Sequence, residues 1–579
     1  MSTAISVEGL TFRYAGRKRA ALTDVSFTIH EGETVLVLGP SGGGKSTLAL
    51  CLNGMIPHVV AGALSGSVRI HGEPVSTRAL AETVRQVGIV FQDPEAQLCM
   101  LRVAEEVAFG LENLALAPEQ MPGRIQRALT LTGLECDGSS RVDWLSGGNK
   151  QRLALACVLA MEPSVLVFDE PTSNLDPAGA QAVFSIIERL KAEGRHTIVV
   201  VEHRLDQLMH LIDRVLVLGP DGRLVDDGEP HHVLERQAQA LDAFGIWKPQ
   251  VSELAAALRA RGFALRDFPI TVEEAERSLA PLTLDSWTFG NASPRAEHCW
   301  SSESPAIRVH GLSAAYGRGT NVLRDVHLDV QHGELLALVG PNGAGKTTLA
   351  HHLIATLTAP KGTVFLEERD IRHIRGNELA ETVGYVFQNP EHQFVARTVL
   401  DELAFGLRLR GWSEDEVRRR VNEMLDDFGL AGLAAANPFK LSHGEKRRLS
   451  VATMLILKQR VLVLDEPTFG QDRRHANALL EKFEALHAAG TTLLIITHDM
   501  RLVAEHADRV AVLHGGRVLA HATPDEVFDD EELLATAHLQ VPPIRALAQR
   551  VLEPQPGGAL PSTVEGFVAC LRPQSVGVA

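Results

Sequence analysis

Short apolar runs rich in β-branched residues recur along the chain and predict the strands of a buried sheet. They lie at residues 34–38, 165–168, 197–201 and 215–218 in the first half and at 335–339 and 461–464 in the second. Short apolar runs without polar alternation are typical of strands covered on both faces of a parallel sheet. A helical pattern follows the first run of each half. We therefore expect an α/β fold with a mainly parallel central sheet in each half.

A glycine-rich loop joins strand to helix in both halves. The first loop comprises Gly39, Pro40, Ser41, Gly42, Gly43, Gly44, Lys45, Ser46 and Thr47, and the second comprises Gly340, Pro341, Asn342, Gly343, Ala344, Gly345, Lys346, Thr347 and Thr348. In such a loop the backbone N–H groups converge on phosphates at a helix N-terminus, the lysine reaches the β- and γ-phosphates, and the next hydroxyl faces Mg²⁺. Two such loops in the strand–loop–helix context predict two sites for ATP and Mg²⁺.

Each half also has a strand that ends in two acids, Asp169-Glu170 and Asp465-Glu466, followed both times by Pro-Thr. The first acid suits the Mg²⁺ shell, and the second is placed to polarise a water on the γ-phosphate. A strand that ends in an ordinary solvated acidic turn would explain such an acid pair in one half, but not the same Pro-Thr continuation in both halves. The acid pairs differ by 465 − 169 = 296 positions and the loop lysines by 346 − 45 = 301, so one duplicated unit explains the order of the motifs.

Residues 145–152, Leu-Ser-Gly-Gly-Asn-Lys-Gln-Arg, and 441–448, Leu-Ser-His-Gly-Glu-Lys-Arg-Arg, resemble the signature motif of ABC ATPases. Each signature serine precedes its acid pair by 23 positions (169 − 146 and 465 − 442). The resemblance covers about residues 5–240 and 306–530. It implies two tandem ABC-type P-loop ATPase domains, each with a mainly parallel central sheet, an antiparallel β region and a helical signature subdomain.

The resemblance implies two composite ATP sites, because in ABC ATPases the signature of one domain caps ATP on the P-loop of the other. One site would combine the first P-loop with Tyr14, Gln92, Asp169, Glu170 and His203 and with Ser442 and Gly444 of the second half. The other would combine the second P-loop with Tyr316, Gln388, Asp465, Glu466 and His498 and with Ser146, Gly147 and Gly148 of the first half.

Within these sites the resemblance assigns catalysis to Glu170, His203, Glu466 and His498. The Mg²⁺ ligands would be Ser46, Gln92 and Asp169 in one site and Thr347, Gln388 and Asp465 in the other. Tyr14 and Tyr316 would stack on adenine, although a lone tyrosine is also often a packed core residue.

The second half departs from the family pattern at two places. His443 replaces the first signature glycine, and residues 468–472 read Thr-Phe-Gly-Gln-Asp where residues 172–176 read Thr-Ser-Asn-Leu-Asp. Both glutamates and both histidines are present. We therefore expect both sites to hydrolyse ATP, the one capped by Ser442 and Gly444 more slowly.

Residues 91–97 and 387–393 look most like the ATPases of energy-coupling factor transporters, bacterial importers of vitamins and transition-metal ions. This implies two partners, an integral membrane coupling subunit and a membrane substrate-binding subunit. Asp93, Glu95 and Glu391 could pair with partner arginines, or they could cap helices or face water. Two alternatives are the fused ATPase of another importer, against which the intact second motif set argues, and a soluble ABC ATPase acting on ribosomes. The neutral-to-acidic region between the halves argues against the second.

Composition adds little support for other classes. The chain has 56 basic and 72 acidic residues, a net charge of −16 and no basic tract, so we expect no nucleic-acid partner. No apolar run approaches the ~20 residues of a transmembrane helix, and no signal-peptide pattern is present. Its six cysteines form no Cys-x-x-Cys pair, which favours a reducing compartment. We expect a peripheral protein at the cytoplasmic face of the cell membrane, in contact with the membrane only through partners.

The domain organisation follows from the repeat. We expect a first nucleotide-binding domain at 1–240, a helical extension at 241–285, a linker at 286–305, a second nucleotide-binding domain at 306–530 and a C-terminal helical extension at 531–579. The extensions belong to the repeat, because Pro249 and Pro542 precede similar apolar patterns at an offset of 542 − 249 = 293. We expect them to help hold the halves together.

Overall fold

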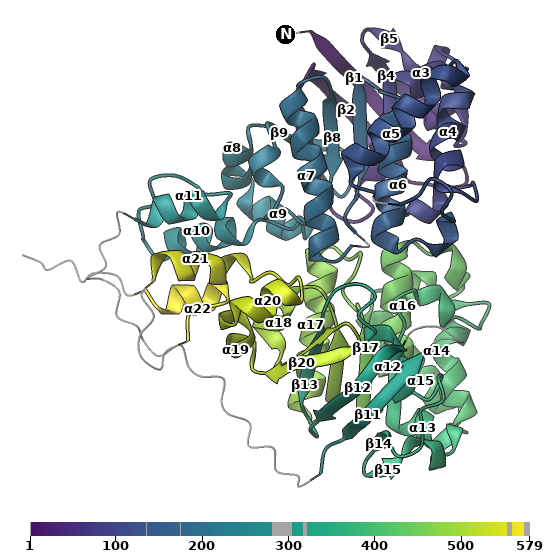
Figure 1. Ribbon diagram of the computed structural model, residues 1–579, viewed down its shortest axis with the longest axis vertical. Helices are drawn as coiled ribbons and strands as arrows, with labels where there is room; N and C mark the ends of the chain where they lie inside the picture. Colours follow the sequence, from purple (N-terminus) through teal and green to yellow (C-terminus); the bar gives the residue numbers. More distant parts are fainter. Residues whose placement is uncertain are drawn as a thin grey trace, which may run out of the picture. The chain divides into compact units, whose positions relative to one another are not determined.

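The computed structural model describes residues 2–134, 136–173, 175–280, 304–315, 321–552 and 559–571. The chain forms two compact units, one centred on Met1–Trp287 and the other on Thr288–Gln471 and His475–Leu571 (Figure 1). Each unit contains one copy of the repeat. The expected domain boundaries remain predictions, and most of the expected linker lies outside the described residues.

A six-stranded sheet forms the centre of the first unit, in the order β10-β9-β3-β8-β7-β6. Its strands are β10 (Leu224–Gly228), β9 (Arg214–Leu218), β3 (Thr34–Leu38), β8 (Thr197–Val201), β7 (Val165–Asp169) and β6 (Val87–Val90). Every neighbouring pair is parallel except β9 and β10. The expected mainly parallel sheet is therefore confirmed. Because the carboxyl ends of parallel strands meet at one edge, the segments after β3, β6, β7 and β8 come together there.

An antiparallel sheet of four strands packs against this centre. It consists of β2 (Leu22–His30), β1 (Thr3–Tyr14), β4 (Gly62–Ile70) and β5 (Glu73–Pro74). The main apolar core joins both sheets to α1 (Lys45–Asn53), with Phe12, Leu48 and Val167 fully or almost fully buried. This core holds the loop between β3 and α1 against a rigid base.

A separate layer of helices begins after Gln92, and its last helix starts within the signature, in line with the expected helical signature subdomain. They are α4 (Val103–Asn113), α5 (Met121–Thr132) and α6 (Gly147–Ala160) (Figure 1). Their apolar faces make a core of their own, which includes Val107, Leu129 and Leu153. The helix α7 (Pro177–Glu193) follows the acid pair, and the short helices α2 (Met55–His58) and α3 (Leu80–Gln86) connect strands.

The second unit repeats this topology. Its central sheet has the order β16-β17-β18-β13-β19-β20, and its antiparallel sheet has the order β12-β11-β14-β15. The central strands are β16 (Val383–Val386), β17 (Val461–Asp465), β18 (Thr492–Ile496), β13 (Leu335–Val339), β19 (Arg509–His514) and β20 (Arg517–Ala522). The antiparallel strands are β12 (Asn321–Val330), β11 (Ile307–Ala315), β14 (Val364–Leu366) and β15 (Arg369–Asp370). The helices are α12 (Lys346–Leu353), α13 (Gly376–Thr382), α14 (Val399–Leu409), α15 (Glu414–Asp427), α16 (His443–Leu455), α17 (Arg473–Ala488) and α18 (Met500–His506).

Each unit closes with a series of short helices, the first of which lies before the start of the expected extension. The first unit ends with α8 (Pro230–Arg236), α9 (Ala238–Phe244), α10 (Gln250–Ala260) and α11 (Val272–Leu279). The second ends with α19 (Pro524–Asp529), α20 (Glu531–Thr536), α21 (Pro543–Val551) and α22 (Val564–Ala569). That the extensions hold the halves together stays a prediction. Within the described ranges, none of the helices has the length and apolar character needed to cross a membrane.

Candidate functional site

The glycine-rich loops take the conformation that phosphate binding requires. Each helix that follows, α1 or α12, begins at the loop lysine, and the glycine before it, Gly44 or Gly345, has a positive φ of 94° or 105°. A Cβ atom at Gly44 would lie 2.4 Å from the carbonyl oxygen of Ala21, so no other residue fits there. The loop therefore presents its backbone N–H groups at a helix N-terminus.

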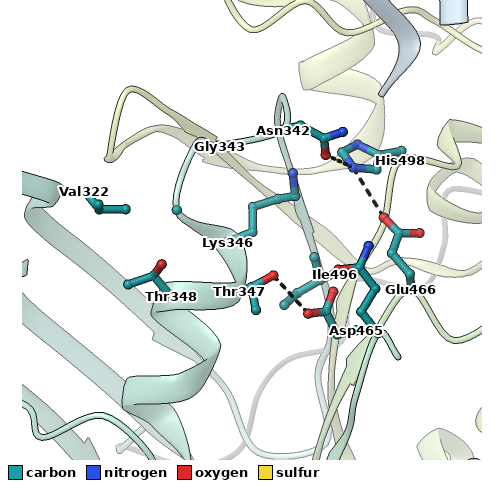
Figure 2. A pocket seen from close by; sticks show the side chains of 12 residues that line it. Val322, Asn342, Gly343, Lys346, Thr347, Thr348, Asp465, Glu466, Ile496 and His498 are labelled. Carbon is teal, nitrogen blue, oxygen red and sulfur yellow. Dashed lines mark hydrogen bonds and ion pairs between the residues drawn. The ribbon is translucent and has the colours of Figure 1, made fainter. Parts of the chain in front are cut away.

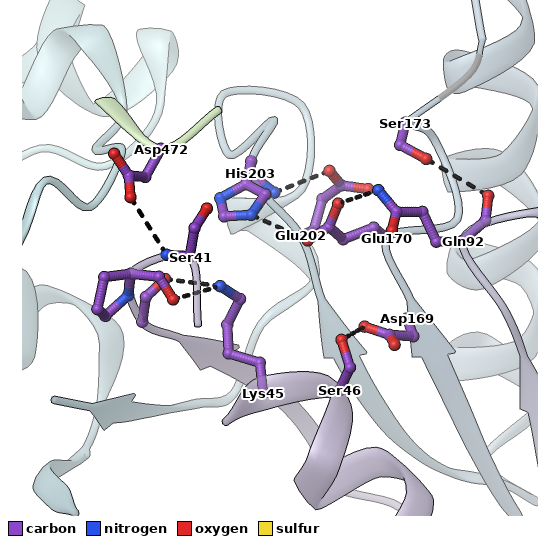
Figure 3. Close-up of polar contacts among 12 residues, drawn as sticks. Ser41, Lys45, Ser46, Gln92, Asp169, Glu170, Ser173, Glu202, His203 and Asp472 are labelled. Carbon is purple, nitrogen blue, oxygen red and sulfur yellow. Dashed lines mark hydrogen bonds and ion pairs between the residues drawn. The ribbon is translucent and has the colours of Figure 1, made fainter. Parts of the chain in front are cut away.

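In the first unit the loop lysine and the following serine reach different partners. Lys45 is buried, and its Nζ donates to the carbonyl oxygens of Gly39 at 2.8 Å and Pro40 at 3.1 Å. Ser46 Oγ donates to Asp169 Oδ1 at 3.2 Å (Figure 3). The predicted lysine, hydroxyl and first acid thus lie at one end of the sheet.

Three predicted residues that follow three different strands lie together, because Gln92 and His203 both contact the carboxylate of Glu170. Gln92 Nε2 donates to Glu170 Oε2 at 2.8 Å, and His203 Nε2 lies 3.0 Å from Glu170 Oε1 (Figure 3). The backbone of Glu170 has a positive φ of 50°, and its N–H donates to the carbonyl oxygen of Val201 at 2.8 Å. Glu466 takes the same conformation in the second unit, with a φ of 49°. Strained backbone of this kind concentrates at functional sites.

Burial shifts the pKa of the first acid and of the lysine in this site. Burial, together with the charge of Glu170, raises the pKa of Asp169 to about 6, although Ser46 and Lys45 oppose the shift. Burial also lowers the pKa of Lys45, against the attraction of both acids. A buried acid and a buried lysine with perturbed pKa values are typical of a site that binds a charged ligand.

Glu202 is a residue that sequence reasoning did not include in the site. It is buried, and its carboxylate accepts a hydrogen bond from the N–H group of His203 at 2.8 Å (Figure 3). The carboxylate also accepts hydrogen bonds from Thr172 Oγ1 at 2.7 Å and from the N–H group of Arg204 at 3.2 Å. It therefore fixes the turn that carries His203. The feature of the sequence that could have identified Glu202 is its position directly before His203.

In the second unit the predicted residues line one pocket of about 160 Å³ (Figure 2). Its predicted members are Asn342, Gly343, Gly345, Lys346, Thr347, Thr348, Gln388, Asp465, Glu466 and His498. Val322 and Ile496 add apolar surface. Sequence reasoning thus identified most of the lining of this pocket.

The acid of the second pocket has one partner more than its counterpart. Asp465 Oδ2 accepts hydrogen bonds from Thr347 Oγ1 at 3.0 Å and from Tyr385 Oη at 3.0 Å. Burial raises the pKa of Asp465, and these two hydroxyls oppose the shift. Ile89 occupies the position of Tyr385 in the first unit (385 − 296 = 89), so only the second unit can make this contact. Sequence reasoning missed Tyr385 because an aromatic residue in a buried strand gives no polar signal.

The two histidines lie differently within their units. His498 Nε2 is 3.0 Å from Asn342 Oδ1 in the glycine-rich loop and 3.5 Å from Glu466 Oε1 (Figure 2). His203 lies closer to its glutamate. The two units therefore differ in these histidine contacts, and the expected difference in their rates of ATP hydrolysis stays a prediction.

Tyr14 lies next to the first glycine-rich loop. Its hydroxyl is 3.0 Å from Thr47 Oγ1, and its half-buried ring meets Phe12 edge to face at 4.9 Å. The stacking role of Tyr14 stays a prediction, and Tyr316 lies outside the described residues.

The signature serines cap helices. Ser146 Oγ accepts from Asn149 N–H at 3.3 Å at the start of α6, and Ser442 forms a capping box with Glu445 at the start of α16. Side-chain caps of this kind fix the start of a helix. The role of Gly147, Gly148 and Gly444 in capping ATP stays a prediction.

The two departures in the second half contact each other. The ring of His443 meets Phe469 edge to face at 6.1 Å. Gly470 has a φ of 68°, and a Cβ atom there would lie 2.7 Å from the His443 ring. The histidine in the signature and the altered segment after the acid pair therefore form one packed unit.

Comparison with known proteins gives the family. The ABC transporter profile matches the chain twice, over residues 22–173 and 323–469. A Methanosarcina mazei protein named as an ABC transporter ATP-binding protein is 39% identical over 550 residues, covering 94% of this chain and 92% of that protein. A Bacillus subtilis protein, named as the HMP/thiamine import ATP-binding protein YkoD, is 39% identical over 544 residues, covering 93% of this chain and 95% of that protein.

A solved structure from Clostridium perfringens, part of the ABC transporter complex cbiONQ, is 32% identical, covers 42% of this chain and 96% of its own, and has a TM-score of 0.37. With two profile matches and relatives alike over almost their whole length, the chain belongs to the ABC transporter family, as a duplicated ATP-binding protein whose ATPase activity is coupled to transport.

Proposed function

We propose that this chain is the ATP-hydrolysing subunit of an importer of the energy-coupling factor type, for a vitamin, a vitamin precursor or a transition-metal ion. The observation that carries the proposal is the presence of a complete motif set in each half together with the segments at 91–97 and 387–393. The name of the Bacillus subtilis relative, which refers to HMP/thiamine import, supports the same class of cargo.

The residues of the first site fit ATP with Mg²⁺. Lys45 and the loop N–H groups would hold the phosphates, and Tyr14 would stack on adenine. The Ser46 hydroxyl and the Asp169 carboxylate, 3.2 Å apart, are oxygen donors of the kind that Mg²⁺ prefers, and Gln92 would add a third. Bound there, Mg²⁺ would neutralise charge that develops on the phosphates.

In this proposal Glu170 acts as the base toward the attacking water. Its contacts with Gln92 and His203 hold the carboxylate in a fixed orientation. His203 would contact the γ-phosphate. The second site would use Lys346, Thr347, Gln388, Asp465, Glu466 and His498 in the same roles, since they share one pocket.

We also propose that each site is completed by the signature of the other half. The lining of the second pocket includes neither Ser442 nor Gly444 of its own unit. A signature serine at a helix N-terminus offers a hydroxyl and backbone N–H groups to an anion. ATP would then stabilise a closed arrangement of the halves, and hydrolysis would release it.

The membrane partners would dock beside the glutamines. Asp93 caps the short turn η2 (Pro94–Ala96), because its Oδ1 accepts from Glu95 N–H at 2.9 Å. Glu95 pairs with Lys150 of α6, and Glu391 pairs with Lys446 of α16 at 2.5 Å. These pairs lie partly in solvent, so each contributes little stability. A partner arginine, which binds a carboxylate with two hydrogen bonds, could displace the lysine.

The partner assignment can be tested by a tagged pull-down from detergent-solubilised native membranes, followed by mass spectrometry. We expect a multi-helix coupling protein and a small membrane protein that binds the cargo. An untagged strain provides the control. Recovery of ribosomal proteins, or of two conventional permeases without a small binding protein, would overturn the proposal.

The activities of the two sites can be measured separately with single Glu170→Gln and Glu466→Gln variants. Each variant makes the same change, in one half only, and leaves the other site intact. We expect Glu170→Gln to retain the higher ATP turnover, because it inactivates the site that the His443-containing signature caps. His443→Gly in the Glu466→Gln background should then raise the residual rate. Equal residual turnover in the two single variants would refute the asymmetry.

A further inference from the structure

In the second unit the signature helix holds the backbone of the glutamine segment. The side chain of Arg447, in the second turn of α16, is fully buried. Its two terminal nitrogens donate to the carbonyl oxygens of Phe387 at 2.7 Å and Gln388 at 2.6 Å. Burial lowers the pKa of Arg447 to about 10, so the group is charged at neutral pH. Arg447 therefore joins α16 directly to the residues that follow β16.

Two further contacts join the same elements. Gln393 exchanges hydrogen bonds with Ser450: its Nε2 donates to the Ser450 carbonyl oxygen at 2.9 Å, and its Oε1 accepts from Ser450 Oγ at 2.8 Å. Gln393 also donates to Thr453 Oγ1. With the pair between Lys446 and Glu391, residues 387–393 are thus attached to α16 at both ends.

The first unit has different residues at the corresponding positions of α6. Subtracting 296 places Gln151, Ala154 and Cys157 where the second unit has Arg447, Ser450 and Thr453. Gln151 is buried but neutral, and Ala154 has no polar group.

The matching glutamine of the first unit, Gln97, instead bonds to its own strand. Its Oε1 accepts from Phe91 N–H at 3.3 Å, and its Nε2 donates to the Ile89 carbonyl oxygen at 3.4 Å. One of the contacts between the glutamine segment and the signature helix is present in both units. It is the ion pair Lys150–Glu95 in the first unit and Lys446–Glu391 in the second.

We propose that residues 387–393 and α16 move as one body in the second unit, with Arg447 as the positioning residue that couples them, whereas residues 91–97 and α6 of the first unit, joined by the Lys150–Glu95 pair, are coupled more weakly. The proposal rests on the proposed function, in which the membrane partner docks beside the glutamine segment. A displacement of residues 389–393 by that partner is then passed directly to Ser442 at the N-terminus of α16. A displacement of the membrane partner therefore moves the second signature more directly than the first signature.

The first test is hydrogen exchange of the full chain without a membrane partner, measured by mass spectrometry. We expect the peptide that covers 387–393 to exchange more slowly than the peptide that covers 91–97. Arg447→Gln, which installs the residue of the first unit, should raise the exchange rate of 387–393 by about tenfold or more, because two charge-assisted hydrogen bonds are lost. Equal rates for the two wild-type peptides would overturn the proposal, as would an unchanged rate in Arg447→Gln.

A second variant covers the case in which Arg447→Gln does not fold. The double change Ser450→Ala and Thr453→Cys also installs first-unit residues but keeps the buried charge. We expect faster exchange at 390–393 and little change at 387–388, and no change at 390–393 would contradict the proposal. The reciprocal variant Gln151→Arg serves as the matched control, and it should slow exchange at 91–97.

The functional consequence is tested in the complex that the chain forms with its membrane partners. Arg447→Gln should lower the stimulation of ATPase kcat by the partners several-fold while the KM for ATP stays near that of the wild type. An equal loss in kcat and rise in KM would indicate general damage to the site and overturn the coupling role. Since the exchange experiment needs no partner, failure of this inference can be told from failure of the proposed function.

Discussion

The ionised Asp169 carboxylate should make the nucleotide-free protein less stable than an asparagine would. The side chain is only 7% exposed, and its pKa is about 6 in the folded protein, against an ordinary value of 3.8. A group whose folded pKa is raised binds a proton more readily when folded, so stability falls as pH rises from about 4 to about 6. Above pH 6 the full penalty is present.

The magnitude follows from the two pKa values. The difference between 6 and 3.8, at about 1.36 kcal/mol per pH unit, corresponds to about 3 kcal/mol. Asp169→Asn mimics the neutral acid and keeps an oxygen that can accept from Ser46. We therefore expect the variant to be about 3 kcal/mol more stable at pH 8. For a unit the size of Met1–Trp287, with an unfolding entropy of about 0.6 kcal/mol/K, the melting temperature should rise by about 5 °C.

The assay is thermal and urea unfolding of wild type and Asp169→Asn between pH 4 and pH 8, without nucleotide or divalent ions. The stability difference should be small at pH 4 and grow with pH. Asp465→Asn is the matched control, and its gain should be smaller because two hydroxyls donate to that carboxylate. A difference that does not depend on pH would refute the reasoning, because the effect would then not come from burial of charge.

Three further predictions concern single side chains. Tyr14→Ala should weaken ATP binding by about 1–3 kcal/mol in calorimetric titration, whereas Tyr14→Phe should change it much less, since the ring and not the hydroxyl stacks on adenine. Tyr385→Phe should lower the unfolding free energy by about 1.5–3 kcal/mol at pH 8, because Asp465 loses a charge-assisted hydrogen bond; equal loss at a pH where that acid is neutral would contradict this. Burial acts to lower the pKa of His231, but its two glutamate partners outweigh burial and raise it, so the contribution of His231 to stability is complete below about pH 6.5 and is lost as pH rises through the raised value. His231→Gln should therefore destabilise the protein more at pH 6 than at pH 9 in urea unfolding.

The sequence was sufficient for the order of motifs and the class of fold. Apolar runs at 34–38, 165–168 and 197–201 became the buried strands β3, β7 and β8, with β7 one residue longer than predicted. Strands covered on both faces have an uninterrupted apolar pattern, which is why the sequence was sufficient to predict these three strands. The spacing of the glycine-rich loops, acid pairs and signatures likewise predicted the residues that line the second pocket, because these motifs follow strands whose carboxyl ends share one edge.

The sequence alone did not reveal which buried polar groups stabilise these motifs. Tyr385, Arg447 and Glu202 each lie within or beside an apolar run or a motif, and their partners are separated from them by 30 to 80 positions. Neither the local hydrophobic pattern nor the spacing of the motifs indicates a hydrogen bond between residues so far apart in the sequence.

The sequence indicated that the two signatures differ, but only the tertiary structure revealed that the two glutamine segments are held by different partners. The changes from Ala154 to Ser450 and from Gln151 to Arg447 are small in the sequence, yet they redirect a glutamine from its own strand to the signature helix. The physical reason is that a buried polar group must find a partner, and only the packed fold determines which partner lies within reach.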